Sequence, residues 1–322
     1  MDVQVGAVRL PNPVMTASGT AGHGAELAAY FDLSRLGAVV VKSLSARPWP
    51  GNPAPRLHPV RAGMLNSVGL ENPGVDAWLE RDLPPLLATG ARVVVSIWGR
   101  SAGDYAEVAA RLAAGLEAVA ASRGSSGPGG TVVAVEANIS CPNVEDRNRM
   151  FAHSPGAAAE AVGAAVGVLV GTGLPVWAKL SPNVTDIVDI AGAALSAGAG
   201  GLTLVNTLMG MAVDPRTGAP VLGGGGGGLS GAALHPVAVR AVHDCRQAFP
   251  QTAIVGVGGV SSGFDAAELL AAGADAVQVG TATFADPRAP LRVLEDLQAW
   301  CAANDVTAVA RLQRWLCAGG GR

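Results

Sequence analysis

Cys141 stands out among the residues that could do chemistry, because it lies in a polar stretch between Asn138 and Asn143. A cysteine in such a stretch can act as a base or a nucleophile if its surroundings lower the thiol pKa from about 8.5. The alternative interpretation is an inert thiol, the commoner role of a lone cysteine. Pro142 follows directly and cannot continue a strand, so this stretch is predicted to begin a loop.

Two lysines occur in or directly after apolar runs, where charged residues are uncommon. Lys42 follows three valines, and Lys179 interrupts a later run. Either lysine could extend its apolar stem and reach solvent. If both lysines lie at adjacent or facing strand ends, they indicate a site for an anionic or electron-rich ligand. A further run ends in Asn206 and Thr207, whose amide and hydroxyl suit a polar planar ligand.

Glycines follow the last two apolar runs of the chain. Gly258 and Gly259 end the first of these, and Gly280 with Thr281 ends the second. Glycines at such positions let backbone N–H groups approach a phosphate, although tight turns alone would also explain them. A Rossmann dinucleotide site is disfavoured, because no Gly-x-Gly-x-x-Gly opens a first strand–helix unit.

The elements that must position these residues alternate along the chain. Short, β-branched apolar runs predict strands buried on both faces at Pro13–Ala17, Ala38–Lys42, Arg92–Ile97, Val132–Ile139, Pro175–Leu180, Gly201–Asn206, Ala253–Val257 and Ala276–Gly280. Helical spacing is found between strands at Asp104–Ser122, Ala157–Gly171, Asp186–Ala197, Pro236–Ala248 and Phe264–Ala272. The pattern predicts an α/β fold, a (β/α)8 TIM barrel forming a single domain over residues 1–322. A doubly wound open sheet is the competing architecture.

Three long polar or glycine-rich segments, residues 44–75, 140–156 and 207–231, follow predicted strands. They are predicted to be extended loops at the carboxyl ends of the strands, which is the face where barrel active sites are built. The last contains six consecutive glycines, Gly223–Gly228, which could form a flexible linker.

Composition narrows the class of protein. Hydrophobic residues make up 49% of the 322 residues, which excludes a mainly disordered chain. The net charge of -3 gives no electrostatic reason to expect nucleic acid or an anionic membrane. No apolar run reaches the roughly 18–20 residues of a membrane span, and no signal peptide is recognised, so a cytoplasmic protein is expected. No strand end offers a cluster of carboxylates or cysteines, so no metal site is expected.

Several sequence strings together resemble the class 1 dihydroorotate dehydrogenases. They are Asn12-Pro-Val-Met-Thr-Ala-Ser18-Gly-Thr, Met64-Leu-Asn66-Ser-Val-Gly69-Leu70-Glu-Asn72-Pro-Gly, Asn138-Ile-Ser-Cys141-Pro-Asn143-Val, Lys179-Leu-Ser-Pro-Asn, Val205-Asn206-Thr207-Leu, Gly228-Leu-Ser-Gly231, Gly258-Gly259 and Val279-Gly280-Thr281. The resemblance runs from about residue 4 to residue 290 and is greatest to the NAD-linked branch, type 1B.

The resemblance implies an FMN-containing barrel that oxidises dihydroorotate to orotate in pyrimidine biosynthesis. It implies that Cys141 is the general base for the C5 proton, while hydride passes from C6 to flavin N5. The implied substrate-binding residues are Lys42, Asn66, Gly69, Leu70, Asn138, Asn143, Asn206 and Thr207, and Lys42 and Asn138 also reach the flavin. The implied flavin-binding residues are Ser18, Ser43, Lys179, Val205 and Gly231, with Gly258, Gly259, Gly280 and Thr281 at the phosphate.

The chain departs from the family pattern in three places. Ser96 stands where an asparagine is usual, and Trp98 adds a bulky indole close by. The loop Glu145–His153 carries more charge and less glycine than usual, and His235 replaces a lysine of the usual Ser-Gly-Pro-Ala-x-Lys-Pro. These departures leave open an FMN enzyme of the same family that acts on another dihydropyrimidine, an enone or an enamide. A flavin-binding structural subunit whose chemistry lies in a partner is the non-enzymatic alternative.

Type 1B resemblance also implies a separate FAD and 2Fe-2S subunit that passes electrons to NAD. This chain lacks the clustered cysteines of an iron–sulfur centre, so that centre would lie in the partner. Fumarate, as in type 1A enzymes, is the alternative electron acceptor. The resemblance further implies a homodimer.

Overall fold

A parallel barrel forms the centre of the computed structural model, which describes residues 1–123, 129–140 and 150–318. Its 8 strands are β3 (Val14–Thr16), β4 (Val39–Val40), β7 (Arg92–Ile97), β8 (Thr131–Asn138), β9 (Val176–Leu180), β10 (Gly201–Leu204), β13 (Ile254–Val257) and β14 (Ala276–Val279). All the predicted strands are therefore confirmed, with ends within two residues of those predicted. The hydrogen-bonded order is β3-β14-β13-β10-β9-β8-β7-β4, and a parallel bridge between Met15 and Ala38 joins β3 to β4. That bridge closes the ring, so the open-sheet alternative is wrong.

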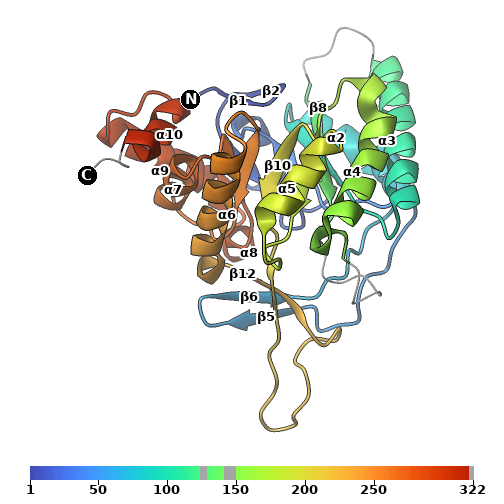
Figure 1. Ribbon diagram of the computed structural model, residues 1–322. Helices are drawn as coiled ribbons and strands as arrows, with labels where there is room; N and C mark the ends of the chain where they lie inside the picture. The colour runs from blue at the N-terminus through green and yellow to red at the C-terminus, as the bar shows by residue number, and fades with distance from the viewer. Residues whose placement is uncertain (124–128, 141–149, 319–322) are drawn as a thin grey trace.

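Burial explains why these residues form a barrel. Every residue of β9, β10, β13 and β14 is buried, because side chains face either the barrel interior or the surrounding helices. The helices are α1 (Val75–Arg81), α2 (Leu83–Ala88), α3 (Ala102–Arg123), α4 (Pro155–Leu169), α5 (Ile187–Ser196), α6 (His235–Ala248), α7 (Gly263–Ala271), α8 (Ala282–Ala285), α9 (Ala289–Ala303) and α10 (Val309–Ala318). Helices α3 to α7 confirm the five predicted segments, and they pack outside the strands in Figure 1.

Helix α7 illustrates how local sequence sets a boundary next to the site. The Ser262 hydroxyl accepts a hydrogen bond from the Asp265 N–H, and the Asp265 carboxylate accepts one from the Ser262 N–H. This reciprocal capping box starts the helix at Gly263, directly after the glycine turn that follows β13. The glycine turn is therefore anchored by the buried strand β13 on one side and by the capped N-terminus of α7 on the other.

A second sheet covers the carboxyl ends of the barrel strands. Its strands are β5 (Leu57–Val60), β6 (Gly63–Asn66), β11 (Leu208–Gly210) and β12 (Gly227–Ser230), in the antiparallel order β11-β12-β6-β5. Figure 1 places this sheet opposite the N-terminal hairpin of β1 (Val3–Val5) and β2 (Val8–Leu10). The predicted long segments 44–75 and 207–231 therefore lie at the carboxyl ends of the barrel strands, as expected. They contain the four strands of this sheet, which the sequence did not predict.

The glycine run is part of this sheet and is not a free linker. Gly227 and Gly228 lie in β12, where Gly228 pairs with Asn66 of β6. A Cβ on Gly227 would collide with the Asn66 carbonyl oxygen, and one on Gly228 with the Thr207 hydroxyl. Gly225 has φ +81° in the preceding turn. The glycines are therefore required by close approach and by a left-handed turn.

One helical segment, Pro155–Thr172, is long and apolar enough to cross a membrane by length and composition. It packs against the barrel through Ala158, Ala161, Val162 and Leu169, which are buried, and the core helix of a globular protein meets the same criteria.

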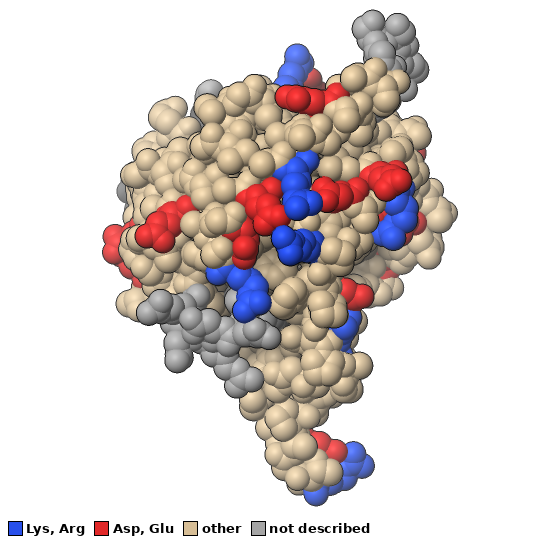
Figure 2. Space-filling model, turned by 90° about the vertical axis from the view of Figure 1, so that its right-hand side faces the viewer, with Lys and Arg blue, Asp and Glu red and all other residues tan. Residues whose placement is uncertain are grey.

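On the face shown in Figure 2, acidic and basic side chains are interspersed.

Candidate functional site

A pocket lies between the carboxyl ends of the barrel strands and the covering sheet. About 1090 Å³ of space free of protein atoms, part of it open to solvent, lies within this pocket. The predicted site residues that line it are Ser18, Lys42, Ser43, Asn66, Gly69, Leu70, Asn138, Lys179, Val205, Asn206, Thr207, Gly258, Gly259, Gly280 and Thr281. Segments distant in the sequence therefore meet in one cavity.

One predicted site residue is placed differently. Gly231 does not line the pocket, although its neighbour Ser230 does. Its φ of +102° and its approach to Gly63 explain why this position is a glycine. Cys141 and Asn143 lie outside the described residues.

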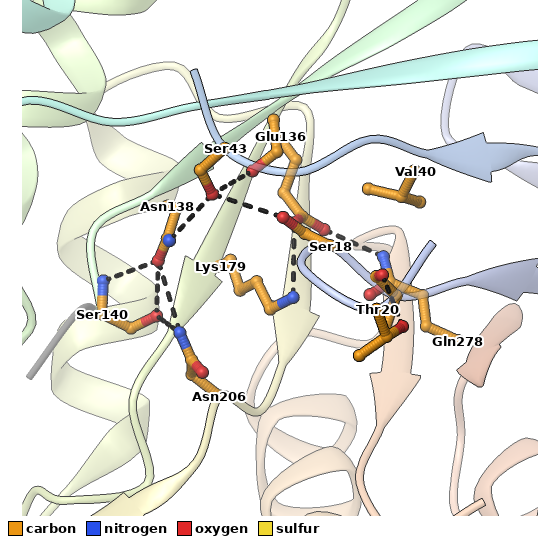
Figure 3. Close-up of polar contacts among 12 residues, drawn as sticks. Ser18, Thr20, Val40, Ser43, Glu136, Asn138, Ser140, Lys179, Asn206 and Gln278 are labelled. Atoms are coloured by element: carbon orange, nitrogen blue, oxygen red, sulfur yellow. Dashed lines mark hydrogen bonds and ion pairs between the residues drawn. The ribbon is translucent and has the colours of Figure 1, made fainter. Parts of the chain in front are cut away.

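Asn138 is the centre of a hydrogen-bond network on one wall of the pocket (Figure 3). Its Nδ2 donates to the Ser43 hydroxyl at 3.1 Å, and its Oδ1 accepts from the Ser140 hydroxyl at 3.0 Å. Asn206 Nδ2 donates to the same Ser140 hydroxyl at 2.8 Å. The network joins the ends of β4, β8 and β10 and fixes the orientation of both amides on the pocket wall.

Ser96 and Trp98, two residues that depart from the family pattern, lie behind the pocket lining. Ser96 is buried and its hydroxyl lies 2.9 Å from that of Ser43, so it extends the same network. The Trp98 side chain is 3% exposed and packs edge-on against Trp49, with ring centroids 5.7 Å apart. Neither residue lines the pocket, so the indole does not narrow the cavity formed by the described residues.

The loop after β6 brings backbone and side-chain groups to the opposite side of the pocket. Lys42 Nζ donates to the Glu71 carbonyl oxygen at 2.6 Å, which ties the lysine to this loop. Asn66 Nδ2 donates to the Gly228 carbonyl oxygen at 3.2 Å. Gly69 and Leu70 have φ values of +71° and +62°. A left-handed leucine is uncommon, and such strained backbone often occurs where a loop shapes a ligand site.

A buried carboxylate lies beneath the pocket, at a position that the sequence analysis missed. Glu136 of β8 has no exposed surface, and its Oε1 lies 3.4 Å from Lys179 Nζ. Gln278 Nε2 of β14 donates to Glu136 Oε2 at 2.9 Å. A carboxylate inside an apolar strand was the available sequence signal. Lys179 lines the pocket and is 5% exposed. The ion pair with Glu136 therefore holds the Lys179 ammonium group at the floor of the pocket.

The glycine turns after β13 and β14 provide backbone donors at one end of the pocket. The N–H groups of Gly259, Gly280 and Thr281 donate no backbone hydrogen bond within the part of the chain that the structure describes. The Thr281 hydroxyl donates to Ser230 Oγ at 2.7 Å and connects this end to β12. Free N–H donors in a glycine turn fit a phosphate. With the cation and amides nearby, they fit the FMN that the sequence implies.

Other residues that sequence reasoning missed contribute apolar surface. Leu57, Met64, Val68, Leu234, Val257 and Phe284 also line the pocket. They have no distinctive spacing along the chain, so only the folded structure identifies them.

Comparison with known proteins assigns the chain to a family. A model described as dihydroorotate dehydrogenase matches residues 1–300. The chain is 45% identical over 312 residues to a protein of Geobacter sp. (strain M21) described as the catalytic subunit of dihydroorotate dehydrogenase B (NAD(+)), with 97% of this chain and 96% of that protein covered. It is 45% identical over 300 residues to a protein of the same description from Alkaliphilus metalliredigens, with 93% of each covered.

A solved structure supports the fold separately. The crystal structure of DHODH in complex with ferulenol from Eimeria tenella superposes with a TM-score of 0.73 at 22% identity, covering 96% of this chain and 86% of that one. The alignment therefore covers nearly the whole barrel described above.

Proposed function

Because the chain belongs to the dihydroorotate dehydrogenase family, we propose that it is an FMN-dependent oxidoreductase that oxidises dihydroorotate to orotate in pyrimidine biosynthesis. The observation that carries the proposal is the convergence of amides, lysines and phosphate-type glycine turns on one pocket. Its shape and donor set match a planar cofactor with a phosphate at one end and a planar substrate beside it. Residues 1–322 act as a single FMN-binding domain in this proposal.

The cofactor residues divide by the part of FMN that they hold. Ser18, Ser43, Lys179 and Val205 would hold the ring and ribityl chain, and Gly258, Gly259, Gly280 and Thr281 would hold the phosphate. When bound, FMN supplies the hydride acceptor. The ammonium of Lys179 would stabilise negative charge on the reduced ring, because a buried cation interacts strongly with charge that develops nearby.

The substrate residues divide between positioning and proton transfer. Asn66, Asn138, Asn143, Asn206 and Thr207, with Gly69 and Leu70 of the loop, would bind the edges of the pyrimidine ring. Lys42 would bind both the substrate and the flavin edge. The thiolate of Cys141 would take the C5 proton, which contributes about 10²–10⁴-fold to the rate when the base is well placed.

An anaerobic titration of the FMN-loaded protein with dihydroorotate tests this function. The flavin absorbance should bleach in proportion to added dihydroorotate, with no other reductant present. If dihydroorotate leaves the spectrum unchanged while dithionite bleaches it, the substrate assignment is wrong.

A second candidate keeps the FMN barrel and changes the substrate to another dihydropyrimidine, an enone or an enamide. The unusual residues of the 145–153 loop favour it. Trp98, the other departure, does not line the pocket and gives it no support. The same anaerobic measurement with a panel of such compounds distinguishes the candidates by which compound bleaches the flavin fastest.

The description of the relatives as NAD-linked catalytic subunits implies a partner subunit for electron transfer. We propose that this partner carries FAD and a 2Fe-2S cluster, that the chain forms a homodimer, and that the assembly is cytoplasmic. The purified chain should then reduce dyes with dihydroorotate but should not reduce NAD+. Efficient NAD+ reduction by the chain alone would contradict the partner requirement, and fumarate reduction would indicate a type 1A acceptor instead.

A further inference from the structure

We propose that His235 is a positioning residue for the phosphate end of the cofactor site. It holds the peptide between Gly258 and Gly259 so that the Gly259 N–H faces the pocket. The inference rests on the proposed function, because it takes the ligand of this turn to be the FMN phosphate.

The imidazole of His235 lies behind the glycine turn. His235 is the first residue of α6, is 9% exposed and does not line the pocket. Its Nδ1 lies 2.7 Å from the Gly258 carbonyl oxygen. A carbonyl oxygen can only accept, so Nδ1 carries a proton and donates to it.

The geometry of a peptide unit converts this contact into an orientation of the turn. In a planar trans peptide, the C=O and the following N–H point in opposite directions. The Gly258 C=O and the Gly259 N–H belong to one such unit. Because His235 holds the carbonyl on the side away from the cavity, the N–H points toward the side that Gly259 lines.

Close packing leaves this turn little freedom to rotate. A Cβ on Gly259 would lie 2.6 Å from His235 Cβ, and one on Gly258 would lie 2.7 Å from Ala238 Cβ. The backbone therefore rests directly on the first turn of α6. A glycine turn has many accessible conformations unless contacts of this kind select one.

Glu268 of α7 orients the imidazole ring. Its Oε2 lies 3.1 Å from His235 Nε2, so both ring nitrogens face acceptors. The ring thus joins α6 to α7 across the turn that follows β13. A side chain held at both ends loses little further freedom when the cofactor binds, which favours a preorganised phosphate site.

Binding of FMN and riboflavin to the apoprotein tests the inference, because riboflavin lacks the phosphate. His235→Leu removes the donor and keeps an apolar side chain. We expect this variant to bind FMN about 3- to 10-fold more weakly, the range for loss of one hydrogen bond, and riboflavin with unchanged affinity. His235→Gln, whose amide can donate to the same carbonyl, should recover most of the FMN affinity.

His243→Leu is the matched control, because it removes an imidazole from the same helix at a position that does not line the pocket. The dissociation constants of FMN and riboflavin for His243→Leu should match those of the wild type. The ³¹P NMR shift of bound FMN should move in His235→Leu and stay in place in His243→Leu.

Equal weakening of FMN and riboflavin by His235→Leu would overturn the inference, since it would indicate a structural role only. Unchanged FMN affinity would overturn it as well. If the leucine variant does not fold, Glu268→Ala decides, because it removes the partner of His235 Nε2. A ratio of the FMN and riboflavin dissociation constants within experimental error of the wild type in Glu268→Ala then overturns the inference. If dihydroorotate does not bleach the flavin but His235→Leu still weakens the binding of FMN and not that of riboflavin, the proposed function is wrong and the inference about His235 stands.

Discussion

Glu136 Oε1 and Lys179 Nζ lie 3.4 Å apart within the barrel, where the carboxylate is fully buried and the lysine is 5% exposed. Gln278 supplies the only other recorded polar contact of that carboxylate among the described residues. Removing both charges from water carries a large cost, so each charge depends on the other. The pair thereby fixes a cation beneath the cofactor pocket.

Breaking this pair should destabilise the apoprotein. We expect Glu136→Gln or Lys179→Met to lower the free energy of unfolding by about 3–5 kcal/mol, because each leaves an uncompensated buried charge. The double variant should be more stable than the sum of the single effects predicts. Urea unfolding of the four proteins without FMN measures this coupling, and strictly additive effects would contradict it.

The barrel strands could be predicted from sequence because each is a short apolar run buried on both faces. The covering sheet could not, because its pairings join distant segments such as Asn66 and Gly228, and its glycines have no side-chain pattern. Helices α1 and α2 were missed because they are short, and the sequence of α2 contains two adjacent prolines, which usually mark a break.

The site was predictable where residues lie at strand ends, because those ends meet at one face of a barrel. Glu136 was missed although a carboxylate inside an apolar strand was a local signal, because its partners Lys179 of β9 and Gln278 of β14 can be identified only in the folded structure. The contact partner of Trp98 could not be predicted either, because only the fold turns its indole toward Trp49.

Cysteine labelling should separate the proposed base from the structural thiols. Burial raises the pKa of Cys245 to about 12, and burial also raises the pKa of Cys301. Since the thiolate is the reactive species, neither should react with iodoacetamide in the native protein, whereas Cys141 should. Peptide mass spectrometry with and without orotate measures this.

Orotate should protect Cys141 from labelling if the thiol faces the substrate. Labelling of denatured protein, in which every cysteine becomes accessible, is the control. Equal labelling of Cys245 and Cys141 in the native state, or no protection by orotate, would contradict the assigned role.

His23 should make the protein less stable in mild acid. Burial lowers the pKa of His23, and the positive charge of Lys42 lowers it further. The unfolded chain, with an ordinary histidine pKa near 6.5, therefore binds more protons than the folded chain as the pH falls below that value. Stability contributed by the neutral imidazole is present above about pH 6.5 and declines as the pH falls.

His23→Gln should consequently lose less stability than the wild type between about pH 7 and pH 5, as measured by urea unfolding. The same substitution at His243 controls for the loss of an imidazole. A pH dependence of His23→Gln identical to that of the wild type would show that this histidine does not titrate differently in the two states.

A single-turnover reaction of the FMN-loaded protein with dihydroorotate under anaerobic conditions tests the central claim most directly, with flavin absorbance and orotate followed together. We predict one orotate formed for each flavin bleached, and a rate about 10²–10⁴-fold lower in Cys141→Ala. Bleaching without orotate, or an unimpaired alanine variant, would contradict the claim.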